Sequence, residues 1–179
     1  MQRLASVFLL SFVAACSHTG DASKESGSAA AGATSPDARF MREIAQANLA
    51  EIATGKLAVA KAQSPEVRRF GQLMIDEHTM MQREGGQLAS SKGMPVPAAP
   101  DAKHQAAAKQ LEQMSGASFD RAYMEQMVKD HAQTLELLQE TVSEAKDSAV
   151  RAHAQKATPH VRQHLDIARR LAGDVVGLR

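Results

Sequence analysis

Residues 64–91, SPEVRRFGQLMIDEHTMMQREGGQLASS, carry the pattern that decides the fold. Their apolar side chains recur at spacings of three and four, which predicts a long amphipathic helix with one buried stripe. The opening Ser-Pro-Glu supplies an N-cap, a proline suited to the first turn and an early carboxylate, so we expect the helix to begin near Pro65. Gly93 and the prolines that follow should end it near Ser91.

The same spacing continues on both sides of this stretch and predicts an all-α protein. Aromatic residues make up only 3% of the chain, Trp is absent, and residues that favour helices dominate. We expect an antiparallel four-helix bundle with one short extra helix between the second and third long helices. The predicted helices span, in order, residues 37–62, 65–91, 101–114, 118–145 and 147–173. Ser118 and Asp147 are the expected caps of the last two, and Pro159 should kink the last or free a carbonyl.

A weak internal repeat indicates how the helices pair. The segment AQSPEVRRFGQ at 62–72 resembles AKDSAVRAHAQ at 145–155, and each marks a joint between two long helices. We therefore expect two helical hairpins that pair into one bundle. Three glycines within the helices, Gly55, Gly85 and Gly86, are expected at places of close packing.

The start of the chain has a different pattern. Residues 1–16, MQRLASVFLLSFVAAC, combine an early positive charge, an apolar run and small residues, which predicts a signal peptide over residues 1–15. Cys16 directly follows Val-Ala-Ala, and this resembles the lipobox of bacterial lipoproteins, which implies a lipid on the Cys16 thiol. The alternative is an ordinary secreted protein with an incidental cysteine. Residues 16–36, rich in Ser, Ala and Gly, should form a flexible tether to a domain at 37–175.

These features predict an exported protein that is anchored to a membrane by lipid. Several acyl chains on one residue anchor firmly, whereas a single chain is marginal. Ser17 rather than Asp follows the cysteine, which by resemblance to lipoproteins of Gram-negative bacteria favours the outer membrane, facing the periplasm. The membrane is thus the expected partner, and no protein partner is indicated. Nucleic acid is not expected, because 21 basic and 20 acidic residues leave a net charge of only +1.

Four polar residues interrupt the buried stripes near the middle of the four long helices: Glu51, His78, His131 and His164. Because a helix rises about 1.5 Å per residue, mid-helix residues of antiparallel neighbours lie at nearly the same level of a bundle. Three imidazoles and one carboxylate would suit a single transition-metal ion, Zn, Cu, Fe or Mn. Alternatively, the histidines could hydrogen-bond one another, Glu51 or water in a polar layer that only fixes the register of the helices.

Other residues near these four could support such a site. His160, one turn before His164, and Glu77 and Asp130, at the edges of the stripes, are candidates for an outer shell. His153 is expected to be an exposed surface residue. Four methionines on the same faces would suit copper(I), although such methionines usually fill a core: Met74, Met81, Met124 and Met127. Cys16 is the only cysteine of the chain, which excludes a cysteine-based zinc or iron–sulfur site.

Four blocks of sequence, which occur in the same order along the chain, together resemble a bacterial family called domain of unknown function 4142. They are FMREIAQANLAEIATGKLA, VRRFGQLMIDEH, FDRAYMEQMVKDH and PHVRQHL, and the resemblance covers about residues 38–173. It implies an outer-membrane or periplasmic protein with a ferritin-like bundle. The family pattern includes positions that match all four inward polar residues, together with Phe119, Asp120 and Tyr123.

The sequence departs from the carboxylate-rich motif of di-iron ferritins. A di-iron bundle uses about four carboxylates and a Glu-x-x-His motif on two helices, and this motif is missing at both His78 and His131. The resemblance therefore does not extend to iron storage or ferroxidase activity.

Three hypotheses about function follow, and the first is favoured. The protein would be a lipid-anchored envelope protein whose bundle binds one transition-metal ion through the four inward residues, in metal handling or stress protection. It could instead be a helical module that binds envelope proteins or peptidoglycan without metal, which an exposed apolar face would favour. A redox or hydrolytic enzyme with an open coordination position ranks last, and a water-filled pocket that reaches His131 or His164 would favour it. No Ser, Cys or Lys nucleophile pattern and no Gly-rich phosphate loop occurs in the sequence.

Overall fold

The computed structural model describes residues 34–177, and these residues form five α-helices without a β-strand. The helices are α2 (Pro36–Lys61), α3 (Pro65–Ser91), α4 (Ala102–Glu112), α5 (Gly116–Glu144) and α6 (Ser148–Gly177). The predicted all-α class and the four-helix bundle with one short extra helix are confirmed. The predicted signal peptide, Cys16 and the tether up to residue 33 lie outside the described residues. None of the described helices combines the length and apolar character needed to cross a membrane.

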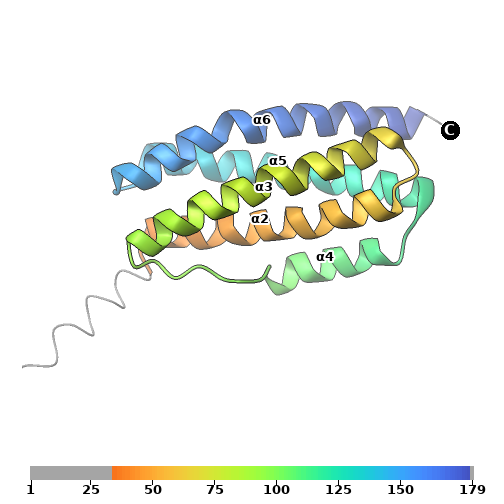
Figure 1. Cartoon of the computed structure of the whole chain (residues 1–179). Coiled ribbons are helices and arrows are strands. Elements are labelled where there is room, and N and C mark those ends of the chain that lie inside the picture. Colours follow the sequence, from red (N-terminus) through yellow and green to blue (C-terminus); the bar gives the residue numbers. More distant parts are fainter. Residues whose placement is uncertain (1–33, 178–179) are drawn as a thin grey trace, which may run out of the picture.

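The four long helices run side by side as two hairpins, α2 with α3 and α5 with α6 (Figure 1). The short helix α4 lies outside this bundle, along α2, and also touches α5. Two apolar clusters occupy opposite ends of the bundle interior. One includes Phe70, Met74 and Tyr123, and the other includes Phe40 and Leu138. The predicted polar residues lie between the two clusters in the sequence of every long helix, so the core is divided by a polar layer.

Two buried aspartates connect the hairpins, because each caps the joint between the two helices of the other hairpin. The carboxylate of Asp120, near the start of α5, accepts hydrogen bonds from the backbone N–H groups of residues 63 and 64 at 2.9 and 2.8 Å. Asp37, near the start of α2, does the same for residues 146 and 147 at 3.1 and 2.8 Å. Each joint between two long helices is therefore satisfied by a side chain from the other hairpin.

The sequence repeat corresponds to this exchange of caps. Arg68 donates to the carbonyl oxygen of Ala62 at the α2–α3 joint, and Arg151 donates to that of Ala145 at the α5–α6 joint. The two aspartates, at 37 and 120, and the two arginines, at 68 and 151, are each 83 residues apart. Each joint is therefore held by an aspartate from the other hairpin and by an arginine that follows the joint.

Helix α5 begins earlier than predicted. Its N-cap is Ser115, not Ser118, and Ser118 lies in the first turn, where its hydroxyl donates to the Ser115 carbonyl at 2.8 Å. Both serines have the residue type of an N-cap, and the chain turns into the helix at Gly116, whose φ of 62° is a left-handed conformation that L residues rarely adopt. The predicted cap Asp147 is confirmed, because its carboxylate accepts from the backbone N–H of Ala149 at 2.8 Å.

Pro159 lies inside α6 without ending the helix. Because proline has no backbone N–H, the carbonyl of Gln155 loses its helical donor at this point. The neighbouring Thr158 hydroxyl bonds the Ala154 carbonyl at 2.8 Å.

Close packing of α2 on α3 depends on two glycines, only one of which was predicted. A Cβ on Gly55 would lie 2.8 Å from the carbonyl oxygen of Gly71, and a Cβ on Gly71 would lie 2.7 Å from the Cβ of Ala58. Gly85 also lies at a contact, with His153. The prediction for Gly86 is wrong, because a Cβ there would meet nothing within 4 Å.

Candidate metal centre

Three of the four predicted ligands come together in the polar layer. His78 on α3, His131 on α5 and His164 on α6 are each at most 3% exposed. Their ring centroids are 5.4 to 5.7 Å apart, and one ring nitrogen from each lies within 4.8 Å of the other two. The mid-helix placement read from the sequence is therefore enough to bring three helices' histidines to one point.

Each of these rings has one nitrogen held by a hydrogen bond. His131 Nδ1 donates to the carbonyl of Met127 at 2.9 Å, and His78 Nδ1 donates to Oδ1 of Asn48 at 2.9 Å. His164 Nε2 donates to the carboxylate of Glu77 at 3.0 Å. Because all three partners are acceptors, these contacts place the ring proton on the bonded nitrogen.

The other nitrogen of each ring has no hydrogen-bond partner within the described residues. These atoms are His78 Nε2, His131 Nε2 and His164 Nδ1. Since the ring proton is on the opposite nitrogen, each of the three carries a lone pair. Buried acceptors without a partner are rare and cost free energy.

Burial keeps the three imidazoles neutral. Desolvation lowers the pKa of His131 to about 3, and it lowers the pKa of His78 well below the ordinary value, with a further contribution from the charge that His131 would carry. Burial also lowers the pKa of His164, although nearby Glu77 opposes this effect. Neutral imidazole is the form that binds metal ions, so the lone pairs are available at neutral pH.

The donor set fits a transition-metal ion. Metal–nitrogen distances of about 2.0–2.1 Å in a tetrahedral site correspond to nitrogens about 3.3 Å apart. One ring nitrogen of each histidine lies within 4.8 Å of the other two, so an ion would draw the rings only slightly closer together. A layer held together by hydrogen bonds between histidines would instead pair donors with acceptors, whereas these three nitrogens are all acceptors.

Glu51, the fourth predicted ligand, lies beside this group but not within it. Its Oε1 is 3.9 Å from His131 Nδ1, the nitrogen that already donates to Met127. Its Oε2 is buried and has no hydrogen-bond partner. Burial, and secondly the charge of Asp130, raise the pKa of Glu51 well above its ordinary value. The buried Tyr123 hydroxyl likewise has no partner, and burial followed by the charge of Glu51 raises the pKa of Tyr123.

The predicted outer-shell residues take different places. Glu77 is hydrogen-bonded to His164, one of the three clustered histidines. The carboxylate oxygen that accepts this bond, Oε2, also accepts a hydrogen bond from His160 Nδ1 at 3.1 Å. Asp130 is half-buried on the other side, near Glu51. His153 is half-buried rather than exposed, because its ring packs edge-on against Phe40 with centroids 6.5 Å apart.

Sequence reasoning missed Asn48, the partner of His78. Asn48 is 2% exposed and lies one turn before Glu51 on the same buried face of α2. Its polarity in an otherwise apolar stripe is the signal that could have identified it. The four methionines, by contrast, belong to the two apolar clusters and pack as core residues.

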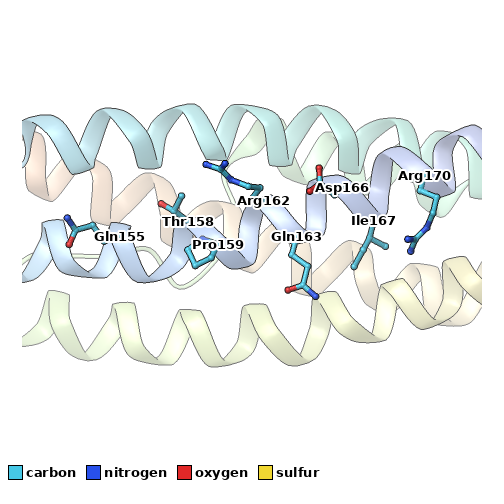
Figure 2. Close-up of a pocket in the computed structure, with 8 residues that line it drawn as sticks. All are labelled: Gln155, Thr158, Pro159, Arg162, Gln163, Asp166, Ile167 and Arg170. Atoms are coloured by element: carbon cyan, nitrogen blue, oxygen red, sulfur yellow. The ribbon is translucent and has the colours of Figure 1, made fainter.

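Two cavities lie against α4, and one of them reaches Glu51. This cavity, of about 230 Å³, is lined by Glu51 together with residues of α2, α4 and α5. A larger hollow of about 680 Å³ runs along the outer side of α6, where Figure 2 shows Pro159, Arg162 and Asp166 among its lining residues. None of the three clustered histidines lines that hollow.

The profile of a family described as "Domain of unknown function (DUF4142)" matches residues 22–171. The chain belongs to the DUF4142 family. No curated protein is significantly similar to this DUF4142 protein.

Two solved structures resemble it in fold. A Streptomyces coelicolor protein described as a DUF305 secreted protein is 15% identical, with a TM-score of 0.68 over 81% of this chain and 95% of that one. A conserved hypothetical protein of Mycobacterium tuberculosis is 17% identical, with a TM-score of 0.60 over 77% of this chain and 91% of that one. At these identities the likeness shows the fold alone.

Proposed function

We propose that this DUF4142 protein binds one transition-metal ion between His78, His131 and His164, and serves in metal handling or stress protection in the cell envelope. The observation that carries this proposal is the set of three unpartnered ring nitrogens, each with its proton held on the far side of the ring. The partners Asn48 and Glu77 orient the rings as outer-shell groups do in metal sites.

The donor set narrows the choice of ion. Imidazole nitrogen suits Zn, Cu and Fe, whereas Mn prefers carboxylate and water oxygens. Since Glu51 lies outside the three-nitrogen group, we favour Zn, Cu or Fe over Mn. Such an ion would supply a Lewis-acid or redox centre with an open position, and Glu51, which lies beside His131, would be the fourth residue to complete its coordination.

The alternative of a metal-free interaction module has no structural observation in its favour. Among the described residues, Val59 and Met80 are the large hydrophobic side chains classed as exposed, and they lie on different helices. Scattered apolar residues of this kind are ordinary on a soluble surface.

The test is the metal content of the full protein, purified from its native membrane without an affinity tag. We expect close to one equivalent of a single metal, measured by plasma mass spectrometry. A His78→Gln, His131→Gln double variant should lose it. The control variant His153→Gln, whose ring packs against Phe40 outside the three-histidine cluster, should keep it. Metal-free wild-type protein that also fails to bind added Zn, Cu or Fe would refute the proposal.

We further propose that the protein is exported and held at the outer membrane by lipid on Cys16, in line with its signal-like leader. The Cys16→Ser variant should lose incorporated radiolabelled fatty acid and leave the membrane fraction. Labelling that persists in the variant, or an unchanged membrane fraction, would contradict lipidation at this residue.

A further inference from the structure

The short helix α4 covers a groove that runs towards the candidate metal centre. Its one buried residue is Leu111, and Lys61 of α2 donates a hydrogen bond to the carbonyl of Glu112 at its end at 2.9 Å. Two cavities, of about 230 and 330 Å³, lie against α4 and share Lys103, His104 and Asp130 in their walls. The interior beneath α4 is thus hollow, unlike the packed clusters at the two ends of the bundle.

The smaller cavity is acidic and leads to a buried carboxylate. Four carboxyl side chains line it, against the single cationic side chain of Lys103 and the imidazole of His104: Glu43, Glu51, Asp101 and Asp130. Because burial raises the pKa of Glu51, the negative charge of the cavity lies mainly on the other three. Glu51 is only 5% exposed, and its Oε2 has no hydrogen-bond partner although it is buried. The distance from Glu51 Oε1 to His131 Nδ1 is 3.9 Å, and Glu51 also lines the cavity, so its side chain lies between the cavity and the three histidines.

The opposite side of the centre, between α3 and α6, suits a cation less well. The cavity there is about 100 Å³, and the positive charge of Lys156 lies in its wall. Lys156 is paired with Glu84 at 2.7 Å, so that carboxylate is already neutralised. Glu77, which stands between this side and the centre, already accepts hydrogen bonds from both His160 and His164 through one oxygen.

From these observations we propose that metal cations reach the three-histidine centre through the acidic cavity under α4, attracted by Asp130 and passed inward by Glu51. This inference rests on the proposed metal binding and adds the route and the residues that serve it. Carboxylates that line a groove raise the local concentration of cations and hence the rate of association. Asp130 acts here as a positioning residue, since it lies in the wall of the cavity and not among the three clustered histidines.

The route can be tested by obstruction, because a side chain that fills the path slows uptake and release equally and leaves the dissociation constant unchanged. Thr134→Trp would place an indole ring in the cavity under α4, and Met80→Trp would place the same ring at the α3–α6 cavity. Stopped-flow uptake of Zn²⁺ by the metal-free full chain, and its release to a chelator, give both rates. We expect both rates to fall in Thr134→Trp and neither in Met80→Trp, with circular dichroism confirming that both variants are folded.

A charge variant provides a second measurement that does not depend on added bulk. Asp130→Asn should lower the association rate by about 3–10-fold at low ionic strength and weaken its dependence on salt. The matched control is Asp166→Asn, which removes the same charge on the outer side of α6 (Figure 2). It should leave the association rate unchanged.

The outcomes separate the route from the site itself. Wild-type protein that takes up no Zn²⁺, Cu or Fe overturns both the metal centre and the route. Zinc binding with unaltered rates in Thr134→Trp and Asp130→Asn overturns the route alone. Slower uptake in Met80→Trp, with Thr134→Trp as fast as wild type, places the path between α3 and α6 and likewise overturns this proposal.

Discussion

His131 shows how a single helix can prepare a metal ligand. Its Nδ1 proton bonds the carbonyl of Met127, four residues earlier on the same helix. The backbone of α5 itself therefore decides which nitrogen carries the proton, and the lone pair on Nε2 faces away from that bond. His78 and His164 need side chains from elsewhere, Asn48 and Glu77, to reach the same state.

Glu77 gives the prediction at this scale. Glu77→Gln keeps the shape of the side chain but removes the charge that holds the His164 Nε2 proton, and loss of an outer-shell partner commonly weakens metal affinity about 10–100-fold. Competition with a chelator of known affinity would measure the change. Glu84→Gln on the same helix, where Glu84 pairs with Lys156 at the surface, should leave the affinity unaltered. Equal affinity in the wild type and Glu77→Gln would show that this contact does not support the ligand.

The sequence predicted these residues to different degrees. The helical period is enough to place His78, His131 and His164 inward at mid-helix, because the period depends only on backbone geometry. It cannot place Glu51 within an ångström, since side-chain direction depends on how neighbouring helices are rotated. Nor did it identify Glu77 as the direct partner of His164, because a residue at the edge of one stripe contacts whichever helix packs there.

At the scale of elements, the capping aspartates hold the two hairpins together. Removing the carboxylate in Asp120→Ala leaves two backbone N–H groups at the α2–α3 joint without acceptors. Hydrogen bonds to a charged group contribute about 1.5–3 kcal/mol each, so we expect the loss of both to lower the free energy of unfolding by about 3–6 kcal/mol. Denaturation with urea would measure it, with the exposed Asp166→Ala as control. A loss no larger than that of the control would mean that water satisfies the joint.

The contact of α2 with α3 gives a second prediction for this scale. Gly71→Ala brings a methyl group within 2.7 Å of the Ala58 Cβ and 2.9 Å of the Gly55 carbonyl oxygen, both of which are rigid parts of α2. Overpacking of this kind costs about 1–3 kcal/mol. Gly86→Ala meets nothing within 4 Å and should instead stabilise the helix by about 0.5–1 kcal/mol. Thermal denaturation of the two variants should therefore shift in opposite directions, and a shared direction would contradict the packing described.

Element boundaries were predictable where local capping chemistry decides them. The Ser-Pro-Glu start of α3 and the Asp147 cap of α6 are encoded within three residues of the boundary. The start of α5 was placed late because both Ser115 and Ser118 have the residue type of an N-cap, and Ser115, the actual cap, makes no side-chain cap hydrogen bond. Gly71 was overlooked for a related reason, since only the partner helix reveals why it lacks a side chain.

For the whole molecule, the candidate metal centre would act as a cross-link between hairpins. His78 belongs to the α2–α3 hairpin, and the other two histidines belong to α5 and α6. Zn²⁺ at about 100 times its dissociation constant should stabilise the fold by about 2.7 kcal/mol. Hydrogen exchange should show the added protection in the middle of all three ligand helices, with little change in α4. Protection confined to one hairpin would contradict a centre shared between them.

The reciprocal capping by Asp37 and Asp120 is the arrangement expected from duplication of a single hairpin. Asp37 caps the backbone N–H groups of residues 146 and 147, just as Asp120 caps those of residues 63 and 64. Two identical hairpins related by a twofold axis would make the same pair of contacts. A single hairpin, paired with its own copy, could make both halves of that contact. The histidines break the symmetry: at the same spacing of 83 residues, His131 corresponds to Asn48, His78 to Val161 and His164 to Met81. Two identical hairpins would carry each of these histidines twice, so the cluster of three requires halves that differ in sequence.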